Sequence, residues 1–173
     1  MIMGKLVNYI TSLHTSTKRN YIDRMNDDKV KCMITAKKYS KEYWDGDRRY
    51  GYGGYNYIPG RWKKVAESLI KNYKLSNDSS ILDVGCGKAF LLFELKTLLP
   101  DLKICGLDSS KYAIENSKKE IKNHLIVHNA KDKYPFEDNK FDLVISFNTL
   151  HNLKIFELKN ALEEIERVGK THL

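Results

Sequence analysis

Apolar residues take up a regular spacing after position 60. Between residues 61 and 73 they recur at helical intervals, as one stripe of an amphipathic helix does. The stripe consists of Trp62, Val65, Ala66, Leu69, Ile70 and Tyr73. The turn-forming residues KLSNDSS (74–80) then end the pattern. We therefore predict an amphipathic helix over 61–73.

Four short apolar runs follow, and they have the character of buried parallel strands. They are ILDVG (81–85), KICGLD (103–108), HLIVHN (124–129) and FDLVISF (141–147). The segments between them read as helices, the first of which should end before Pro100. Ser109 or Ser110 can cap the second.

A last helix is predicted over about 153–168, and the side chains expected on its inner face are Leu158, Leu162, Ile165 and Val168. Strands that alternate with helices predict an α/β fold, with a parallel sheet and helices on both of its faces.

Three segments divide the chain. Residues 1–36 show no convincing period, and we expect a weakly ordered leader there. Residues 37–60 are rich in tyrosine and glycine, and residues 61–173 form the folded domain.

Composition is ordinary for a globular protein, with 42% hydrophobic and 30% charged residues. No apolar run approaches the length of a membrane span, and the N-terminus lacks the features of a signal peptide. Cys32, Cys86 and Cys105 stand far apart, which argues against a disulfide framework or a zinc site. We expect a cytoplasmic protein without a metal.

The net charge of +8 is confined to one part of the chain. Residues 1–80 hold 16 Lys and Arg against 8 Asp and Glu, whereas residues 81–173 hold 14 of each kind. Such a surplus favours a solvated or substrate-attracting surface, and nucleic-acid binding is the less favoured interpretation.

The segment ILDVGCGKAF (81–90) carries the most chemical information. Its two glycines after a strand let bare backbone approach a ligand at the carboxyl edge of the sheet. A dinucleotide-binding loop would need a third glycine where Phe90 stands, and no phosphate-binding G-x-x-x-x-G-K-[ST] loop occurs.

These residues resemble the first motif of the class I S-adenosylmethionine-dependent methyltransferases, D/E-x-G-x-G-x-G, with Ala89 in place of the last glycine. The segments YPFEDNKFDLVISFNTLHNL (134–153) and EEIERVGK (163–170) are similar to later parts of that family. The resemblance covers about residues 61–170 and implies S-adenosylmethionine as the cofactor and a Rossmann-like fold.

The resemblance to the methyltransferase family also implies roles for individual residues. The expected cofactor-binding residues are Asp83, Gly85, Cys86, Gly87, Asp108, Ser109, Ala130, Asp132 and Phe147. Asp108, which ends the second strand, is expected to hold the ribose hydroxyls, because a carboxylate accepts two hydrogen bonds at once. Relatives often have an aspartate where Ala130 stands, and Asp132 is an alternative for that role.

Catalytic candidates follow the fourth strand. Asn148 can hold a polar group of the substrate. His151 can act as a general base or can shape the floor of the pocket, and the sequence leaves both open.

The family's sheet has seven strands in the order 3-2-1-4-5-7-6, but only four are expected in this chain. We therefore predict a truncated member that lacks strands five to seven, with impaired activity. Its fourth strand would be an exposed apolar edge, which a partner subunit or a second copy would have to cover.

The stretch EYWDGDRRYGYGGYNYIPGRW (42–62) looks like the corresponding part of methyltransferases from bacterial surface-polysaccharide gene clusters. It implies a sugar, or a phosphorylated or phosphoramide precursor, as the acceptor. We predict that this segment is a lid over the pocket. The residues expected to act in it are Tyr43, Trp44, Arg48, Arg49, Tyr50, Tyr55 and Arg61. Alternative interpretations are a non-catalytic partner of an intact methyltransferase, and an RNA-binding protein or RNA methyltransferase.

Overall fold

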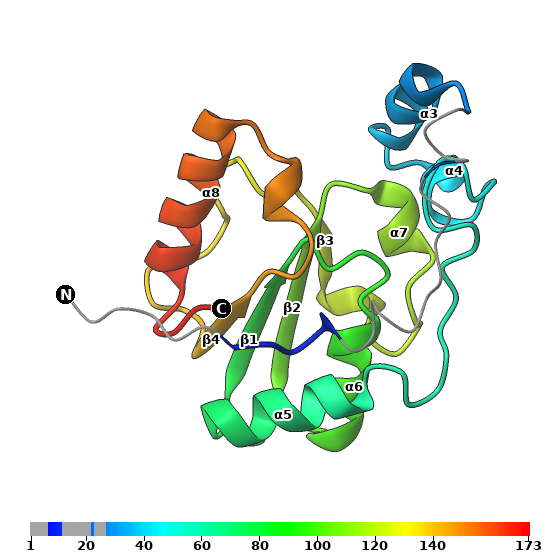
Figure 1. Cartoon of the computed structure of the whole chain (residues 1–173). Coiled ribbons are helices and arrows are strands. Elements are labelled where there is room, and N and C mark those ends of the chain that lie inside the picture. Colours follow the sequence, from blue (N-terminus) through cyan, green and yellow to red (C-terminus); the bar gives the residue numbers. More distant parts are fainter. Residues whose placement is uncertain (1–6, 12–21, 23–26) are drawn as a thin grey trace.

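The structure is a computed structural model of the chain, and it describes residues 7–11, 22 and 27–173. Within them, four strands form one parallel sheet: β1 (Ser80–Val84), β2 (Lys103–Asp108), β3 (Leu125–Val127) and β4 (Leu143–Ile145). Their spatial order is β3-β2-β1-β4 (Figure 1), the order of the first four strands of the family's sheet. The predicted α/β class and parallel sheet are confirmed.

Helices cover both faces of the sheet (Figure 1). They are α5 (Lys63–Tyr73), α6 (Phe90–Leu98), α7 (Lys111–Glu115) and α8 (Ile155–Val168), with short 3-10 turns η1 (Lys122–His124) and η2 (Leu150–Asn152). Ser110 is the cap of α7, because its Oγ accepts a hydrogen bond from the Ala113 N–H at 3.1 Å.

Neighbouring residues of β1 and of β4 enter opposite halves of the core, whereas Ile126 and Val127 of the edge strand β3 are exposed. Ile81 packs with α5 and α6, whereas Leu82 and Val84 pack with α8. Strands that are buried on both faces explain why the apolar runs are nearly continuous. The predicted inner face of α8 needs one correction: Leu162 is 44% exposed, and the fully buried residue of that turn is Ala161. Ile165 and Val168 are buried as predicted and Leu158 is half-buried, so the inner face differs from the prediction at this one position.

The free edge of β4 is not exposed along its length, which corrects the sequence-based expectation. After α8 the chain turns at Gly169 and runs parallel to β4, so that Phe141 pairs with Gly169 and Val144 with His172. The N–H of Val144 donates to the Thr171 carbonyl at 2.8 Å, and the N–H of Leu173 donates to the Val144 carbonyl at 2.9 Å. A Cβ on Gly169 would lie 2.6 Å from the Val144 side chain, so this close pairing requires the glycine.

An N-terminal arm, residues 27–60, lies on the side of the sheet near α7 (Figure 1). It contains α3 (Lys29–Ala36) and α4 (Lys41–Trp44). Helix α3 falls within the leader that was expected to be weakly ordered. The Asp28 carboxylate caps it by accepting from the Lys31 N–H, and Cys32 is buried. The remainder of the predicted leader lies largely outside the described residues.

No helix in the described ranges is long and apolar enough to cross a membrane.

Candidate functional site

The glycine loop that follows β1 needs unusual backbone conformations. Gly85 has φ 82°, Gly87 has φ 57° and Ala89 has φ 56°. The N–H groups of Gly85 and Cys86 both donate to the carbonyl of Leu107, at 2.7 and 3.0 Å, which fixes the loop against the end of β2. A left-handed conformation costs a residue with a Cβ about 1 kcal/mol, which accounts for glycine at this position in the family motif. Ala89 bears that cost here.

Asp108 joins two loops at the carboxyl ends of β1 and β2. One carboxylate oxygen accepts from the Gly87 N–H at 2.8 Å, and the other accepts from the Ser110 N–H at 2.7 Å. Each oxygen has a second lone pair, so the carboxylate can still accept from two hydroxyl groups of a ligand.

Asp83 lies at the end of the neighbouring strand and is 5% exposed. Burial, together with the negative charge of Asp108, raises the pKa of Asp83 to about 7. Burial also raises the pKa of Asp108, and its two backbone N–H donors partly oppose that effect. A buried and a half-buried carboxylate with so little compensating positive charge nearby favour a ligand that brings hydrogen-bond donors and positive charge.

Aromatic side chains of the arm pack directly on the glycine loop. Trp44 is 6% exposed, and a Cβ on Gly87 would come within 2.8 Å of its ring. The Trp44 indole N–H donates to the Ser110 Oγ at 2.8 Å. Tyr52 stacks on Trp44 with ring centroids 5.3 Å apart, and Tyr55 stacks on Phe90 at 5.1 Å. The structure thus brings Trp44 and Tyr55 to the loop, and Tyr43 packs edge-on against Trp44.

An ion pair that the sequence analysis missed fastens the arm to the loop. The Lys88 Nζ donates to both carboxylate oxygens of Asp45, at 2.7 and 2.8 Å, and the Lys88 side chain is 4% exposed. Asp45 also accepts from the Tyr112 hydroxyl at 2.8 Å and from the Tyr55 N–H at 3.0 Å. Burial opposes ionisation of Asp45, but the hydrogen bonds from Lys88 and Tyr112 outweigh it and lower its pKa. In the sequence, the only indication of this ion pair is Lys88, a lysine within a turn that is expected to be buried.

The loop after β4 lies against the same glycines. The Thr149 hydroxyl donates to the Gly85 carbonyl at 3.3 Å. A Cβ on Gly85 would lie 1.9 Å from the Thr149 Oγ1. Phe147 is half-buried, whereas Asn148, at φ 57°, and His151 are exposed. The loop therefore brings Thr149 to Gly85, and the two catalytic candidates on either side of Thr149 in the sequence are exposed.

The other cofactor candidates differ in burial. Ala130 is 9% exposed, and its carbonyl accepts from the Tyr134 hydroxyl at 2.9 Å. Ser109 and Asp132 are exposed. Cys86 is packed beside Gly106, and burial raises its pKa well above the ordinary value for a thiol, which does not suit a nucleophile.

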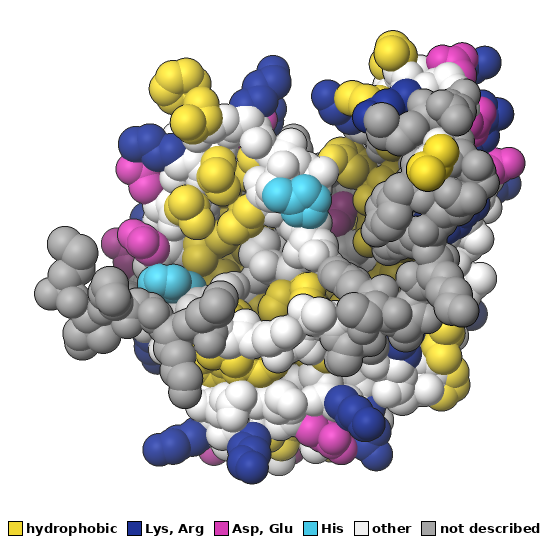
Figure 2. Space-filling view, viewed as in Figure 1, with side chains coloured by type: hydrophobic (Ala, Val, Ile, Leu, Met, Phe, Trp, Pro, Cys, Tyr) yellow, Lys and Arg dark blue, Asp and Glu magenta, His cyan; other side chains and the backbone are white. Residues whose placement is uncertain are grey.

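The three arginines of the predicted lid are not brought together. Arg48 donates to the Gly51 carbonyl, and Arg49 forms a salt bridge with Asp27 and lies over the ring of Tyr50. Arg61 instead lines a cavity beside α5. Figure 2 shows a hollow between the part of the molecule that carries α8 and the arm, with hydrophobic and acidic side chains inside it and a histidine at its rim.

Comparisons with known proteins agree with this geometry. Residues 75–172 match the family model described as a methyltransferase domain. The chain is 32% identical over 114 residues to a demethylmenaquinone methyltransferase of Staphylococcus carnosus, with 63% of this chain and 45% of that protein covered. It is 26% identical over 133 residues to the ribosomal RNA small subunit methyltransferase C of Buchnera aphidicola, with 71% and 40% covered. The solved structure of the PH0226 protein of Pyrococcus horikoshii superposes with a TM-score of 0.56 at 26% identity, covering 75% of this chain and 58% of that one.

The chain belongs to the class I S-adenosylmethionine-dependent methyltransferases, an enzyme family whose cofactor is S-adenosylmethionine. It spans less than half of the length of the curated relatives named above.

Proposed function

We propose that this chain binds S-adenosylmethionine at the carboxyl ends of β1 and β2 and transfers its methyl group to a small-molecule acceptor. The observation that carries the proposal is the pair of carboxylates beside the glycine loop: Asp83, which is buried, and Asp108, which is half-buried. Bound there, S-adenosylmethionine supplies an activated methyl group on a positively charged sulfur.

The residues present fit that cofactor. Asp108 has lone pairs left for the ribose hydroxyls, and Asp83 favours a cationic neighbour. The rings of Trp44 and Tyr55 pack at the loop, where they would keep water away from a bound cofactor. His151 is the residue we assign to accept the proton of the acceptor, and Asn148 the one that orients it.

For the acceptor, we propose a sugar, or a phosphorylated or phosphoramide precursor of a bacterial surface polysaccharide. The support is the resemblance of residues 42–62 and the positive charge that is confined to residues 1–80. RNA is the second acceptor to test, because one relative is named as a ribosomal RNA methyltransferase.

Calorimetric titration with S-adenosylmethionine tests the first step. We expect saturable binding that weakens roughly tenfold or more in Asp108→Asn, since a charged hydrogen-bond acceptor is lost. Asp101→Asn removes an exposed carboxylate near the start of β2 and should bind like the wild type. Circular dichroism checks that each variant is folded. No binding by the folded wild-type chain would overturn the proposal.

Transfer of a labelled methyl group to glucose 1-phosphate and to a short single-stranded RNA tests the second step. Labelling of the sugar phosphate supports the proposal. Labelling of the RNA alone would favour an RNA methyltransferase, and cofactor binding without transfer would favour a non-catalytic partner of another methyltransferase.

A further inference from the structure

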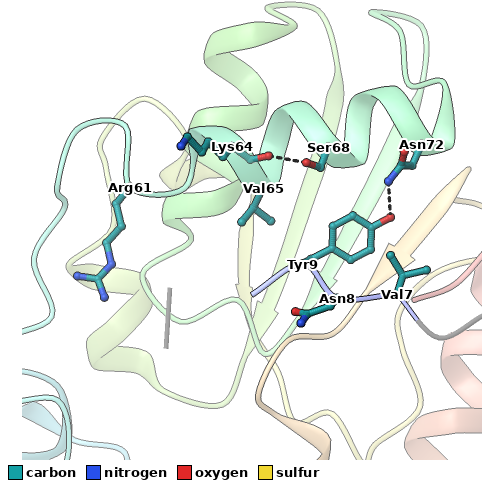
Figure 3. Close-up of a pocket in the computed structure, with 8 residues that line it drawn as sticks. All are labelled: Val7, Asn8, Tyr9, Arg61, Lys64, Val65, Ser68 and Asn72. Carbon is teal, nitrogen blue, oxygen red and sulfur yellow. Dashed lines mark hydrogen bonds between the residues drawn. The ribbon is translucent and has the colours of Figure 1, made fainter. Parts of the chain in front are cut away.

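A cavity of about 300 Å³ lies between α5 and the N-terminal segment 7–9, apart from the glycine loop (Figure 3). Its volume falls at the lower end of the range for small-molecule sites. Tyr9 and Asn72 close one side, because the Asn72 amide donates to the Tyr9 hydroxyl at 2.9 Å. Asn8 and Ser68 add further polar groups to the wall.

The cavity is positively charged. Arg61 and Lys64 line it, and no aspartate or glutamate is among its lining residues. Figure 3 shows both basic side chains at the same end, near the start of α5. Neither forms a salt bridge within the part of the chain that the structure describes, whereas the adjacent Lys63 lies 4.0 Å from Glu67. These two cations are therefore available to a ligand.

The cavity adjoins the proposed site of methyl transfer on two sides. The Tyr9 ring lies 6.4 Å from that of Phe147, which follows β4. Arg61 is close enough to Tyr55 to act electrostatically on its hydroxyl, and Tyr55 in turn stacks on Phe90 at the start of α6. A ligand anchored by its charged end in the cavity could thus extend towards the carboxyl edge of the sheet.

We propose that this cavity binds the phosphate group of the methyl acceptor, a small sugar phosphate, through Arg61 and Lys64. The inference rests on the proposed function, and it assigns the acceptor to a place. A guanidinium matches phosphate oxygens with two parallel hydrogen bonds, and a lysine adds a point charge. The Ser68 hydroxyl donates to the Lys64 carbonyl at 2.8 Å, and the Asn8 Oδ1 accepts from the Thr11 N–H at 3.1 Å. The remaining lone pairs of Ser68 and the remaining amide groups of Asn8 and Asn72 can bind sugar hydroxyls. Arg48 and Arg49 have no part in this site, because each already engages another group of the arm.

Titration of the ¹⁵N-labelled chain, residues 1–173, with glucose 1-phosphate, followed by NMR, tests the assignment. We expect saturable shifts of the amides of Arg61, Lys64 and Ser68, and no comparable shifts with glucose. The double variant Arg61→Gln/Lys64→Gln should bind at least roughly tenfold more weakly. Lys71→Gln is the matched control, because Lys71 is an exposed cation on the same helix that does not line the cavity.

Shifts that do not saturate, or that persist in the folded double variant, would overturn the proposal. The proposal would also be overturned if a short single-stranded RNA shifted the same amide resonances and glucose 1-phosphate did not displace it. A separate titration with S-adenosylmethionine keeps the two proposals distinct. If S-adenosylmethionine shifts the amide resonances of the glycine loop but the sugar phosphate does not shift those of α5, only the acceptor assignment fails.

Discussion

Asp83 and Asp108 show how much of the chemistry of this site resides in two side chains. They end neighbouring strands of the sheet, and the register of β1 and β2 places Asp83 opposite Gly106, two residues before Asp108. Burial is the main reason that the proton stays on Asp83 to about pH 7, and the charge of Asp108 adds to it. A cationic ligand would reverse this preference, since it stabilises the ionised carboxylates.

This raised pKa predicts a pH dependence of stability. Below about pH 4 both the folded and the unfolded chain carry the Asp83 proton, and between about pH 4 and pH 7 only the folded chain retains it. The free energy of unfolding should therefore fall as pH rises through this interval, by at most about 1.4 kcal/mol per pH unit from this group. Asp83→Asn should flatten that part of the profile.

Urea unfolding of the wild type and of Asp83→Asn at pH 5, 6 and 7 measures the difference. Groups far from residue 83 titrate alike in both proteins, so the comparison reports on Asp83 together with its interaction with Asp108. Parallel profiles for the two proteins would contradict the prediction.

At the scale of elements, the arm and the glycine loop form one packed unit. Trp44 of the arm covers Gly87 of the loop, and the next residue of the arm, Asp45, forms the ion pair with the next residue of the loop, Lys88. The arm lies over the loop where the sequence predicts a lid. Its opening and closing stay a prediction.

The ion pair predicts a non-additive pair of substitutions. Asp45→Ala leaves the buried Lys88 ammonium without its partner and should destabilise the chain by about 3 kcal/mol or more. Adding Lys88→Met removes the stranded charge, so the double variant should be more stable than Asp45→Ala alone. Urea unfolding gives the free energies, and hydrogen exchange of the Tyr55 amide reports on the arm.

Glu163→Ala is the control, because it breaks the exposed ion pair with Lys159 and should cost less than about 0.5 kcal/mol. If the effects of Asp45→Ala and Lys88→Met simply add, the ion pair does not hold the arm.

At the scale of the whole molecule, residues 169–173 pair with the edge of β4. Backbone hydrogen bonds join residues 170–173 to β4 and its flanks, through Phe141, Val144 and Ser146. Parallel pairing is possible because α8 crosses the sheet and returns the chain to the same end. An apolar strand that would otherwise attract other chains is thereby paired.

Deletion of residues 170–173 should therefore lower the free energy of unfolding by about 2–4 kcal/mol, from several lost hydrogen bonds. It should also cause concentration-dependent association, which light scattering detects. The double substitution Lys170→Ala/His172→Ala keeps the backbone pairing and should stay monodisperse. A deleted chain that is as stable and as monodisperse as the wild type would show that the pairing contributes nothing.

The α/β class, the positions of the four strands and the presence of Asp83, Gly85, Gly87 and Asp108 at strand ends can all be predicted from the sequence. These features are local, because period, turn residues and glycine spacing are written along the chain. Three contacts depend on the tertiary structure instead. Asp45 forms an ion pair with Lys88, Arg61 lines the cavity beside α5 rather than lying with Arg48 and Arg49, and residues 169–173 pair with β4. Such contacts join segments that are far apart along the chain, or depend on how the chain turns between elements, so no local pattern specifies them.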